Sequence, residues 1–152
     1  MTTTLRTDSK NMDFQSLVKL LDAELASRDG AEHSYYAQFN KIDHLNHAVV
    51  IFENEVPVAC GAMKAFDENS MEVKRMYALE NKRGQGFAQL VLAELEKWAA
   101  EIGIQRCVLE TGKRQPEAIR FYTKSGYQTI PNYGQYIGVE NSVCFEKILS
   151  GC

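Results

Sequence analysis

The chain has 152 residues, of which 45% are hydrophobic and 24% charged, which is typical of one compact domain spanning 1–152 rather than of a disordered chain. Its formal net charge of −3 argues against a nucleic-acid-binding protein, which normally carries an excess of Lys and Arg. No apolar run approaches the ~20 residues of a membrane-spanning helix, and the N-terminus lacks a signal-peptide pattern, so we expect a cytoplasmic protein without a membrane partner.

The first part of the chain is predicted to form a strand, two helices and a hairpin. A strand is expected near Thr2–Arg6, and apolar residues at helical spacing predict a helix over 11–30. A short second helix is expected around Glu32–Asn40. Two apolar runs, His47–Phe52 and Val56–Phe66, flank a polar turn and predict a β-hairpin.

The second part begins with an alternating strand and a glycine-rich turn that leads into a long helix ending at Gly103. The remaining elements alternate between strands and one further short helix. The predicted ranges are Met71–Ala78, Ile104–Glu110, Pro116–Ser125, Tyr127–Ile130 and Val143–Leu149. Strands and helices in this order predict an α/β layered domain around a mixed, mostly antiparallel sheet with about four helices.

The strongest functional signal is the loop Arg83-Gly84-Gln85-Gly86-Phe87-Ala88, which connects a predicted strand to the long helix. A helix N-terminus offers free backbone N–H groups and the positive end of the helix dipole, and both suit a pyrophosphate. The segment lacks the Gly-Lys-Ser/Thr ending of a P-loop and the third glycine of the dinucleotide fingerprint. By itself, the loop is equally well explained as a turn that only begins the helix.

Two motifs together resemble the GNAT superfamily of acetyl-CoA-dependent N-acetyltransferases. Arg83, Gly86 and Ala88 match its cofactor loop, and the segment from Gln115 to Tyr122 matches a second region that opens a short helix after the next strand. Gln115 stands where the family has Asn. The resemblance extends over residues 10–149.

The resemblance implies a sheet that splays between its fourth and fifth strands and a cofactor, acetyl-CoA, bound there as co-substrate. Pantetheine would pair with the backbone around Met76, Tyr77 and Ala78, and a backbone N–H near Met76 or Tyr77 would hold the oxyanion. The amides of Arg83–Ala88 would bind the pyrophosphate, and Gln115 and Ala118 would contact the cofactor. Tyr122 would donate a proton to the departing thiolate; the alternative is that it only packs beneath its helix.

The base that deprotonates the amine is predicted to be a carboxylate, either Glu110 or Glu72, although both could equally cap a loop or pair with a cation. His33, His44 and His47 have neither metal-ligand spacing nor an adjacent nucleophile, so no metal site is predicted. The cysteines lie mostly in apolar runs and are expected to be buried thiols rather than nucleophiles.

The expected reaction is acetyl transfer to an amine by direct attack in a ternary complex. Acids and tyrosines in the segments around Asp29–Tyr36 and Pro131–Tyr136 favour a cationic small-molecule or peptide amine. A non-catalytic acyl-CoA sensor with the same fold is the alternative from another functional class. The sequence is compatible with a monomer or a homodimer.

Overall fold

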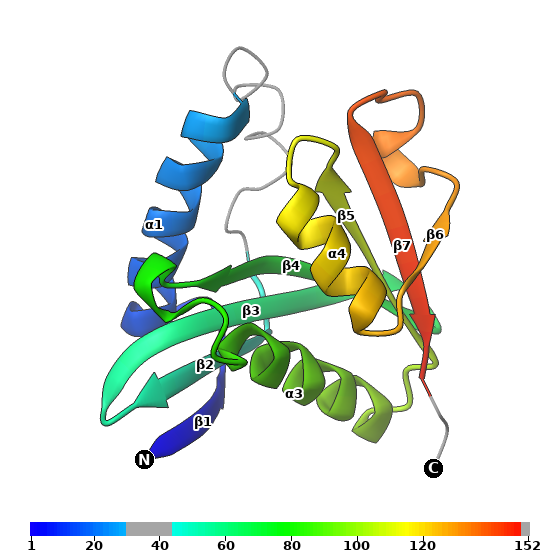
Figure 1. Cartoon of the computed structure of the whole chain (residues 1–152). Helices are drawn as coiled ribbons and strands as arrows, with labels where there is room; N and C mark the ends of the chain where they lie inside the picture. The colour runs from blue at the N-terminus through cyan, green and yellow to red at the C-terminus, as the bar shows by residue number, and fades with distance from the viewer. Residues whose placement is uncertain (30–43, 150–152) are drawn as a thin grey trace. The chain divides into compact units, whose positions relative to one another are not determined.

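The computed structural model describes residues 1–29 and 44–149, which form two compact units (Figure 1). Unit 1 comprises Met1–Lys64 and Val73–Trp98, and unit 2 comprises Ala65–Glu72 and Ala99–Cys152. The helix expected at Glu32–Asn40 lies outside the described residues. Among the described residues, no helix is long and apolar enough to cross a membrane.

The elements that lie wholly or mostly in unit 1 confirm the predicted strand, helix and hairpin of the N-terminal part. Their bounds are β1 Thr2–Thr7, α1 Met12–Asp29, β2 His47–Glu53, β3 Val56–Asp67, β4 Ser70–Ala78 and α3 Phe87–Glu101. Strands β1, β2 and β3 pair antiparallel in sequence order. Asn54 and Glu55 join β2 to β3 with φ values of 51° and 70°, the left-handed geometry that a two-residue hairpin turn needs.

Helices α1 and α3 cover opposite faces of β3. Cys60 and Ala62 belong to a buried cluster with Phe14 and Val18 of α1. Gly61, between them, faces the other way, where an added Cβ would meet side chains of α3. Because successive residues of a strand alternate between faces, the continuous apolar run of β3 is explained by burial on both sides.

Gly61 is a position at which any side chain should destabilise the fold. A Cβ there would lie 2.5 Å from Met76 Sδ and 2.7 Å from Val91 Cγ1. We expect Gly61→Ala to lower the free energy of unfolding by about 1–3 kcal/mol, measured by urea denaturation. Gly112→Ala is the control, because its added Cβ would come no closer than 3.4 Å to a neighbouring atom. Equal stability of the two variants would contradict the expected overpacking.

Unit 2 contains the remaining strands and the last helix, with bounds β5 Arg106–Gly112, α4 Pro116–Lys124, β6 Gln128–Ile130 and β7 Ser142–Ile148. Strand β7 pairs antiparallel with β5 along its whole length and with β6 on its other edge. The hydrogen-bonded strand order is β1-β2-β3-β4-β5-β7-β6, which confirms the predicted mixed sheet. The structure describes three α-helices in residues 1–29 and 44–149, and the fourth expected helix falls outside these residues.

The parallel ladder between β4 and β5 is short. It runs from Ser70–Glu72 opposite Arg106–Val108, although β4 continues to Ala78 and β5 to Gly112. Pairing between the fourth and fifth strands thus stops at Glu72 and Val108, in agreement with the predicted separation of these strands.

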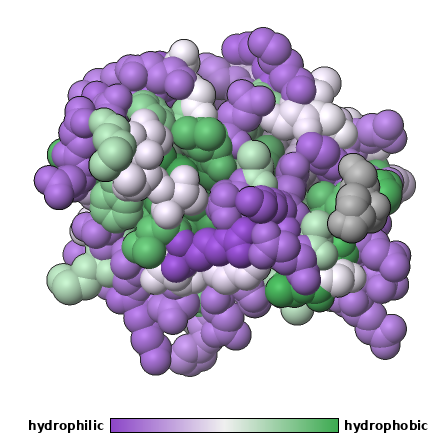
Figure 2. All heavy atoms as spheres, turned by 90° about the horizontal axis from the view of Figure 1, so that it is seen from below, coloured by the Kyte–Doolittle hydropathy of each residue, from purple (hydrophilic) through white to green (hydrophobic). Residues whose placement is uncertain are grey.

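The face shown in Figure 2 mixes polar and charged side chains with exposed apolar ones, as ordinary protein surfaces do.

Candidate functional site

The glycine loop of unit 1 has the geometry of an anion-binding helix entry. A 3₁₀ turn over Glu80–Lys82 follows β4, and Gly84 and Gly86 then take φ values of 81° and 88°. No described atom lies within 4 Å of where a Cβ would stand on either glycine. The first hydrogen bond of α3 runs from Leu90 N–H to Gly86 O, so the amides of Phe87–Gln89 precede it.

The basic side chains of the loop are paired rather than free. Arg83 donates to Glu24 at 2.7 Å, and its Nε donates to the Ala78 carbonyl oxygen at 3.0 Å. Lys82 donates to Glu53 at 2.6 Å. Each carboxylate offsets much of the positive charge that the sequence offers beside the loop. The attraction of this loop for an anion therefore depends chiefly on its backbone amides and the dipole of α3.

The end of β4 holds the residues expected to line pantetheine. Met76 and Tyr77 are half-buried and Ala78 is buried. Arg75, immediately before them, has a φ of 61°, which interrupts the regular alternation of the strand. The Ala78 carbonyl oxygen already accepts from Arg83, which leaves one of its two lone pairs for a ligand.

Helix α4 of unit 2 carries the predicted acid. Tyr122 is buried, and its ring packs edge-on against Phe121 at 5.1 Å and Tyr127 at 5.8 Å between centroids. Burial, and secondarily the charge of Glu110, raise the pKa of the Tyr122 phenol above its ordinary value. The residue is thus an aromatic anchor of α4 as well as a phenol that stays protonated.

The start of α4 contains the other predicted cofactor contacts. Gln115 is the N-cap of the helix and Pro116 occupies its first turn, where a missing N–H costs nothing. The Gln115 side chain makes no capping hydrogen bond, and Ala118 is half-buried. The helix thus begins where the sequence predicts. The amide side chain of Gln115 does not cap this helix.

The two candidate bases lie in unit 2 and project from the same face of the sheet. Glu72 stands opposite Val108 in the parallel ladder, and Glu110 follows two residues after Val108. Glu72 is 3% exposed and accepts a 2.7 Å hydrogen bond from Tyr133 Oη. Glu110 is half-buried and accepts a 2.7 Å hydrogen bond from Ser142 Oγ.

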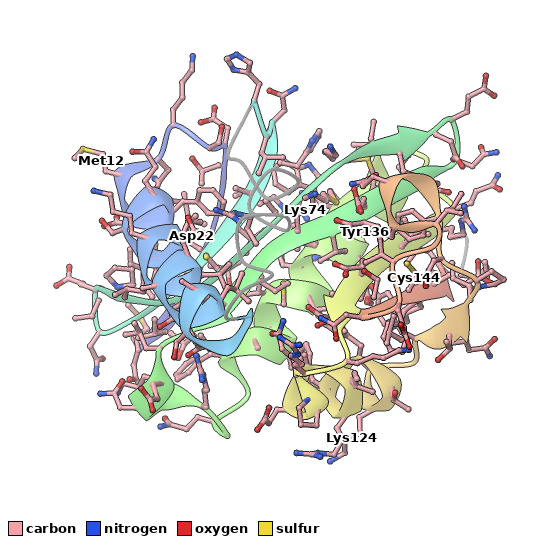
Figure 3. All side chains as sticks on the ribbon, turned by 90° about the horizontal axis from the view of Figure 1, so that it is seen from above. Met12, Asp22, Lys74, Lys124, Tyr136 and Cys144 are labelled. Atoms are coloured by element: carbon pink, nitrogen blue, oxygen red, sulfur yellow. The ribbon has the colours of Figure 1, made fainter. Side chains whose placement is uncertain are left out.

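Two tyrosines that follow β6 accompany these carboxylates. Burial, followed by the charge of Glu72, raises the pKa of Tyr133. Tyr136 lies in the 3₁₀ turn Gly134–Tyr136. Burial raises the pKa of its phenol, and the charge of Glu110 raises it further. Figure 3 labels Tyr136 and Cys144 within this part of the structure. The sequence places these tyrosines on the acceptor side, but no local pattern in it reveals the hydrogen bonds from Tyr133 to Glu72 and from Ser142 to Glu110.

Among the described cysteines, Cys144 lies close enough to Tyr133, Glu72 and Glu110 to interact with them electrostatically. Cys60, Cys107 and Cys144 are buried and form no disulfide with one another, as expected, and burial raises the pKa of Cys60 to about 12. His47 packs edge-on against Trp98 at 4.7 Å, and burial lowers its pKa. Within residues 1–29 and 44–149, no group of three or more His, Cys, Asp or Glu side chains could hold a metal ion.

Comparison with solved structures identifies the class of fold. A Klebsiella pneumoniae protein, provisionally assigned as an acyl-CoA N-acyltransferase, is 30% identical, with a TM-score of 0.82 over 99% of both chains. The PaiA N-acetyltransferase of Thermoplasma acidophilum, solved with coenzyme A, is 17% identical, with a TM-score of 0.71 over 97% of this chain and 99% of its own. The fold is that of acyl-CoA N-acyltransferases.

Comparison of sequences gives the family. The model of the acetyltransferase (GNAT) family matches residues 14–127, and this chain therefore belongs to that family. An uncharacterized N-acetyltransferase of Bacillus subtilis, YjcF, is 26% identical over 93 residues, or 61% of this chain and 64% of its own length. The match thus spans less than two thirds of that relative.

Proposed function

We propose that this chain transfers the acetyl group of acetyl-CoA to an amine by direct attack in a ternary complex. The observation that carries this proposal is the loop before α3, where Gly84 and Gly86 hold the left-handed geometry that frees the helix amides for a pyrophosphate. Membership of the GNAT family supports acetyl-CoA as the co-substrate, as does the coenzyme A bound to the Thermoplasma neighbour. We further propose that residues 1–152 act as one domain, because the family match spans parts of both units.

The cofactor residues have distinct proposed roles. The amides of Arg83–Ala88 bind the pyrophosphate, and the backbone of Met76–Ala78 pairs with pantetheine. A backbone N–H near Met76 or Tyr77 donates to the oxyanion, and Gln115 and Ala118 contact the cofactor from α4. These roles need backbone donors at fixed positions, which is what a strand end and a helix N-terminus provide.

The proposed chemistry requires three proton transfers. Glu110 or Glu72 takes a proton from the acceptor ammonium, directly or through water, so that the nitrogen lone pair can attack the acetyl carbon. The new C–N bond forms and the C–S bond breaks, which leaves an N-protonated amide and a thiolate. Tyr122 donates its phenolic proton to the thiolate, and the surplus proton on nitrogen passes to the resulting phenolate, directly or through water. No metal is needed for this sequence of steps.

The acceptor is proposed to be a small-molecule or peptide amine. Glu72 and Glu110, which project from one face of unit 2, supply negative charge that suits an ammonium group. Tyr133 orients one of these carboxylates by its hydrogen bond to Glu72. A protein that bound acetyl-CoA yet released no thiol with any amine would instead be an acyl-CoA sensor.

Substitution of Gly86 tests the loop. Gly86→Ala forces an L side chain into a φ of 88°, so the loop must change its conformation and the dissociation constant for coenzyme A should rise at least about tenfold. Gly103→Ala is a matched control, because Gly103 has a φ of 89°, equally open surroundings and a place at the other end of α3. Isothermal titration calorimetry measures both variants. Equal affinities for coenzyme A would mean that the loop only begins the helix.

A further inference from the structure

Arg75 is a buried charge in the middle of β4, within unit 1. Its exposed fraction is 6%. In the sequence it follows the apolar residues Met71 and Val73 at every second position. Its φ of 61° lies in the left-handed region that non-glycine residues rarely adopt. Its carbonyl oxygen accepts a 3.5 Å contact from the buried Cys60 thiol. The chain therefore accepts both backbone strain and charge burial at this one residue.

The guanidinium of Arg75 is only partly satisfied. Nη2 donates to both carboxylate oxygens of Asp22, on α1, at 3.0 and 3.1 Å. Nε and Nη1 are buried, and neither has a hydrogen-bond partner in the described part of the chain. A buried N–H without a partner loses its hydration and gains nothing in exchange, so such groups are rare in native proteins.

Arg106 of unit 2 shows what a purely structural arginine looks like in this chain. Its Nε donates to Ser70 Oγ at 2.8 Å, Nη1 donates to Glu146 at 2.9 Å, and Nη2 lies 3.5 Å from Asp67. Every guanidinium nitrogen of Arg106 has a partner, although this side chain is much less buried than that of Arg75. An ion pair that only fastened β4 to α1 would not explain the vacant donors of Arg75.

The charges around Arg75 limit the charge of any further group that its vacant donors could bind. Burial lowers the pKa of its guanidinium, and the neighbouring charge of Asp22 opposes that effect. One positive and one negative charge leave the pair close to neutral, so a singly charged carboxylate is tolerated better than a doubly charged phosphate. Half of the Asp22 side chain, labelled in Figure 3, is exposed, whereas only 3% of the Arg75 side chain is, so a carboxylate that reached Nε or Nη1 would have to displace neighbouring atoms.

We propose that Arg75 binds a carboxylate of the acceptor, so that the acceptor is an amine of the amino-acid class; this inference rests on the proposed acetyltransferase function. Either vacant donor, Nε or Nη1, would give the carboxylate a charge-assisted hydrogen bond, which is the strong kind in proteins. The same contact places the acceptor by a group remote from the reacting nitrogen. Arg75 is thus a specificity-determining residue, and its side chain takes no part in the proton transfers.

The test uses matched acceptors. The twenty common α-amino acids and their carboxamides are assayed one by one with acetyl-CoA for thiol release, with putrescine and spermidine as amines that lack a carboxylate. At least one amino acid should exceed its own carboxamide in kcat/KM by about 10- to 100-fold, as expected for hydrogen bonds to a charged group. If carboxamides or polyamines are acetylated as well as every amino acid, the proposal is wrong.

Variants assign the preference to Arg75. In Arg75→Met, kcat/KM for the preferred amino acid should fall about 10- to 100-fold, with the value for its carboxamide nearly unchanged. Arg6→Met is the control, because Arg6 also forms an ion pair in unit 1, with Glu94, and should keep the preference. A parallel loss for acid and amide would reduce Arg75 to a structural role. Arg75→Lys, which keeps the charge but loses the fork of donors, replaces Arg75→Met if circular dichroism shows that the latter unfolds.

A binding measurement separates this proposal from the general one. Calorimetry with amino acids in the presence of coenzyme A detects acceptor binding even where no turnover occurs. If coenzyme A binds but no amino acid either binds or is acetylated, the carboxylate proposal fails, while acetyl transfer to another amine still stands. If coenzyme A itself does not bind, the proposed function fails.

Discussion

Tyr122→Phe should lower kcat by about 10²-fold and leave KM for acetyl-CoA nearly unchanged. The phenol donates its proton only as the C–S bond breaks, so its loss affects the transition state more than the bound substrate. Thiolates of pKa about 8.5 leave readily, which places the effect at the lower end of general acid catalysis. Steady-state kinetics with saturating acceptor measures both constants. The ring itself stays in its buried aromatic cluster, so the fold is retained.

The pH dependence follows from the raised pKa of Tyr122. A raised pKa means that the phenol remains protonated above the ordinary range of tyrosine, so the acid is present in its active form from pH 6 to pH 9. The loss of rate in Tyr122→Phe should therefore have the same factor across that range. Tyr127→Phe is the matched control, since Tyr127 is also buried and packs on Tyr122, and its kcat should change by less than about threefold. Equal kcat in Tyr122→Phe and the wild type would leave this residue with packing alone.

Most of the fold could be predicted because its signals are local. The hairpin of β2 and β3 follows from two apolar runs around a short polar turn, and the start of α4 follows from Pro116. The glycine loop could be predicted for the same reason, because positive φ at Gly84 and Gly86 is a property of the residue type. The resemblance of this loop and of Gln115–Tyr122 to GNAT motifs gave the family, which the comparisons confirm.

The remaining features of the candidate site depend on partners distant in the sequence. Arg83 and Glu24 are 59 residues apart, and Tyr133 and Glu72 are 61 residues apart, so no local pattern could pair them. The strain and the vacant donors of Arg75 were also missed. The sequence did contain one sign of Arg75: it lies on the same side of β4 as the apolar residues Met71 and Val73. A charged residue at such a position is either exposed by a bend of the strand or buried with a partner.

Glu110→Gln should lower kcat/KM about 10²-fold near pH 7, because the variant keeps the shape and the Ser142 hydrogen bond but cannot take a proton. Glu110 is preferred over Glu72 because Glu110 is partly accessible to solvent, whereas only 3% of Glu72 is exposed. A proton that Glu110 receives can therefore pass to solvent more readily. The charge of Glu110 also acts on Tyr122, so the candidate base and the candidate acid sense each other electrostatically. Activity is measured as kcat/KM from pH 6 to pH 10 with one acceptor.

The pH profile distinguishes a base from a carboxylate that only binds the ammonium. As pH rises toward the acceptor's own pKa, about 10 for an alkylamine, neutral amine becomes available without help and the need for a base disappears. The deficit of Glu110→Gln should therefore shrink with rising pH. In Glu72→Gln, the amide oxygen can still accept from Tyr133, so a smaller deficit of constant factor is expected. If both variants follow the wild-type profile, the base is neither carboxylate, and the proton must leave to solvent or to another residue on the acceptor side.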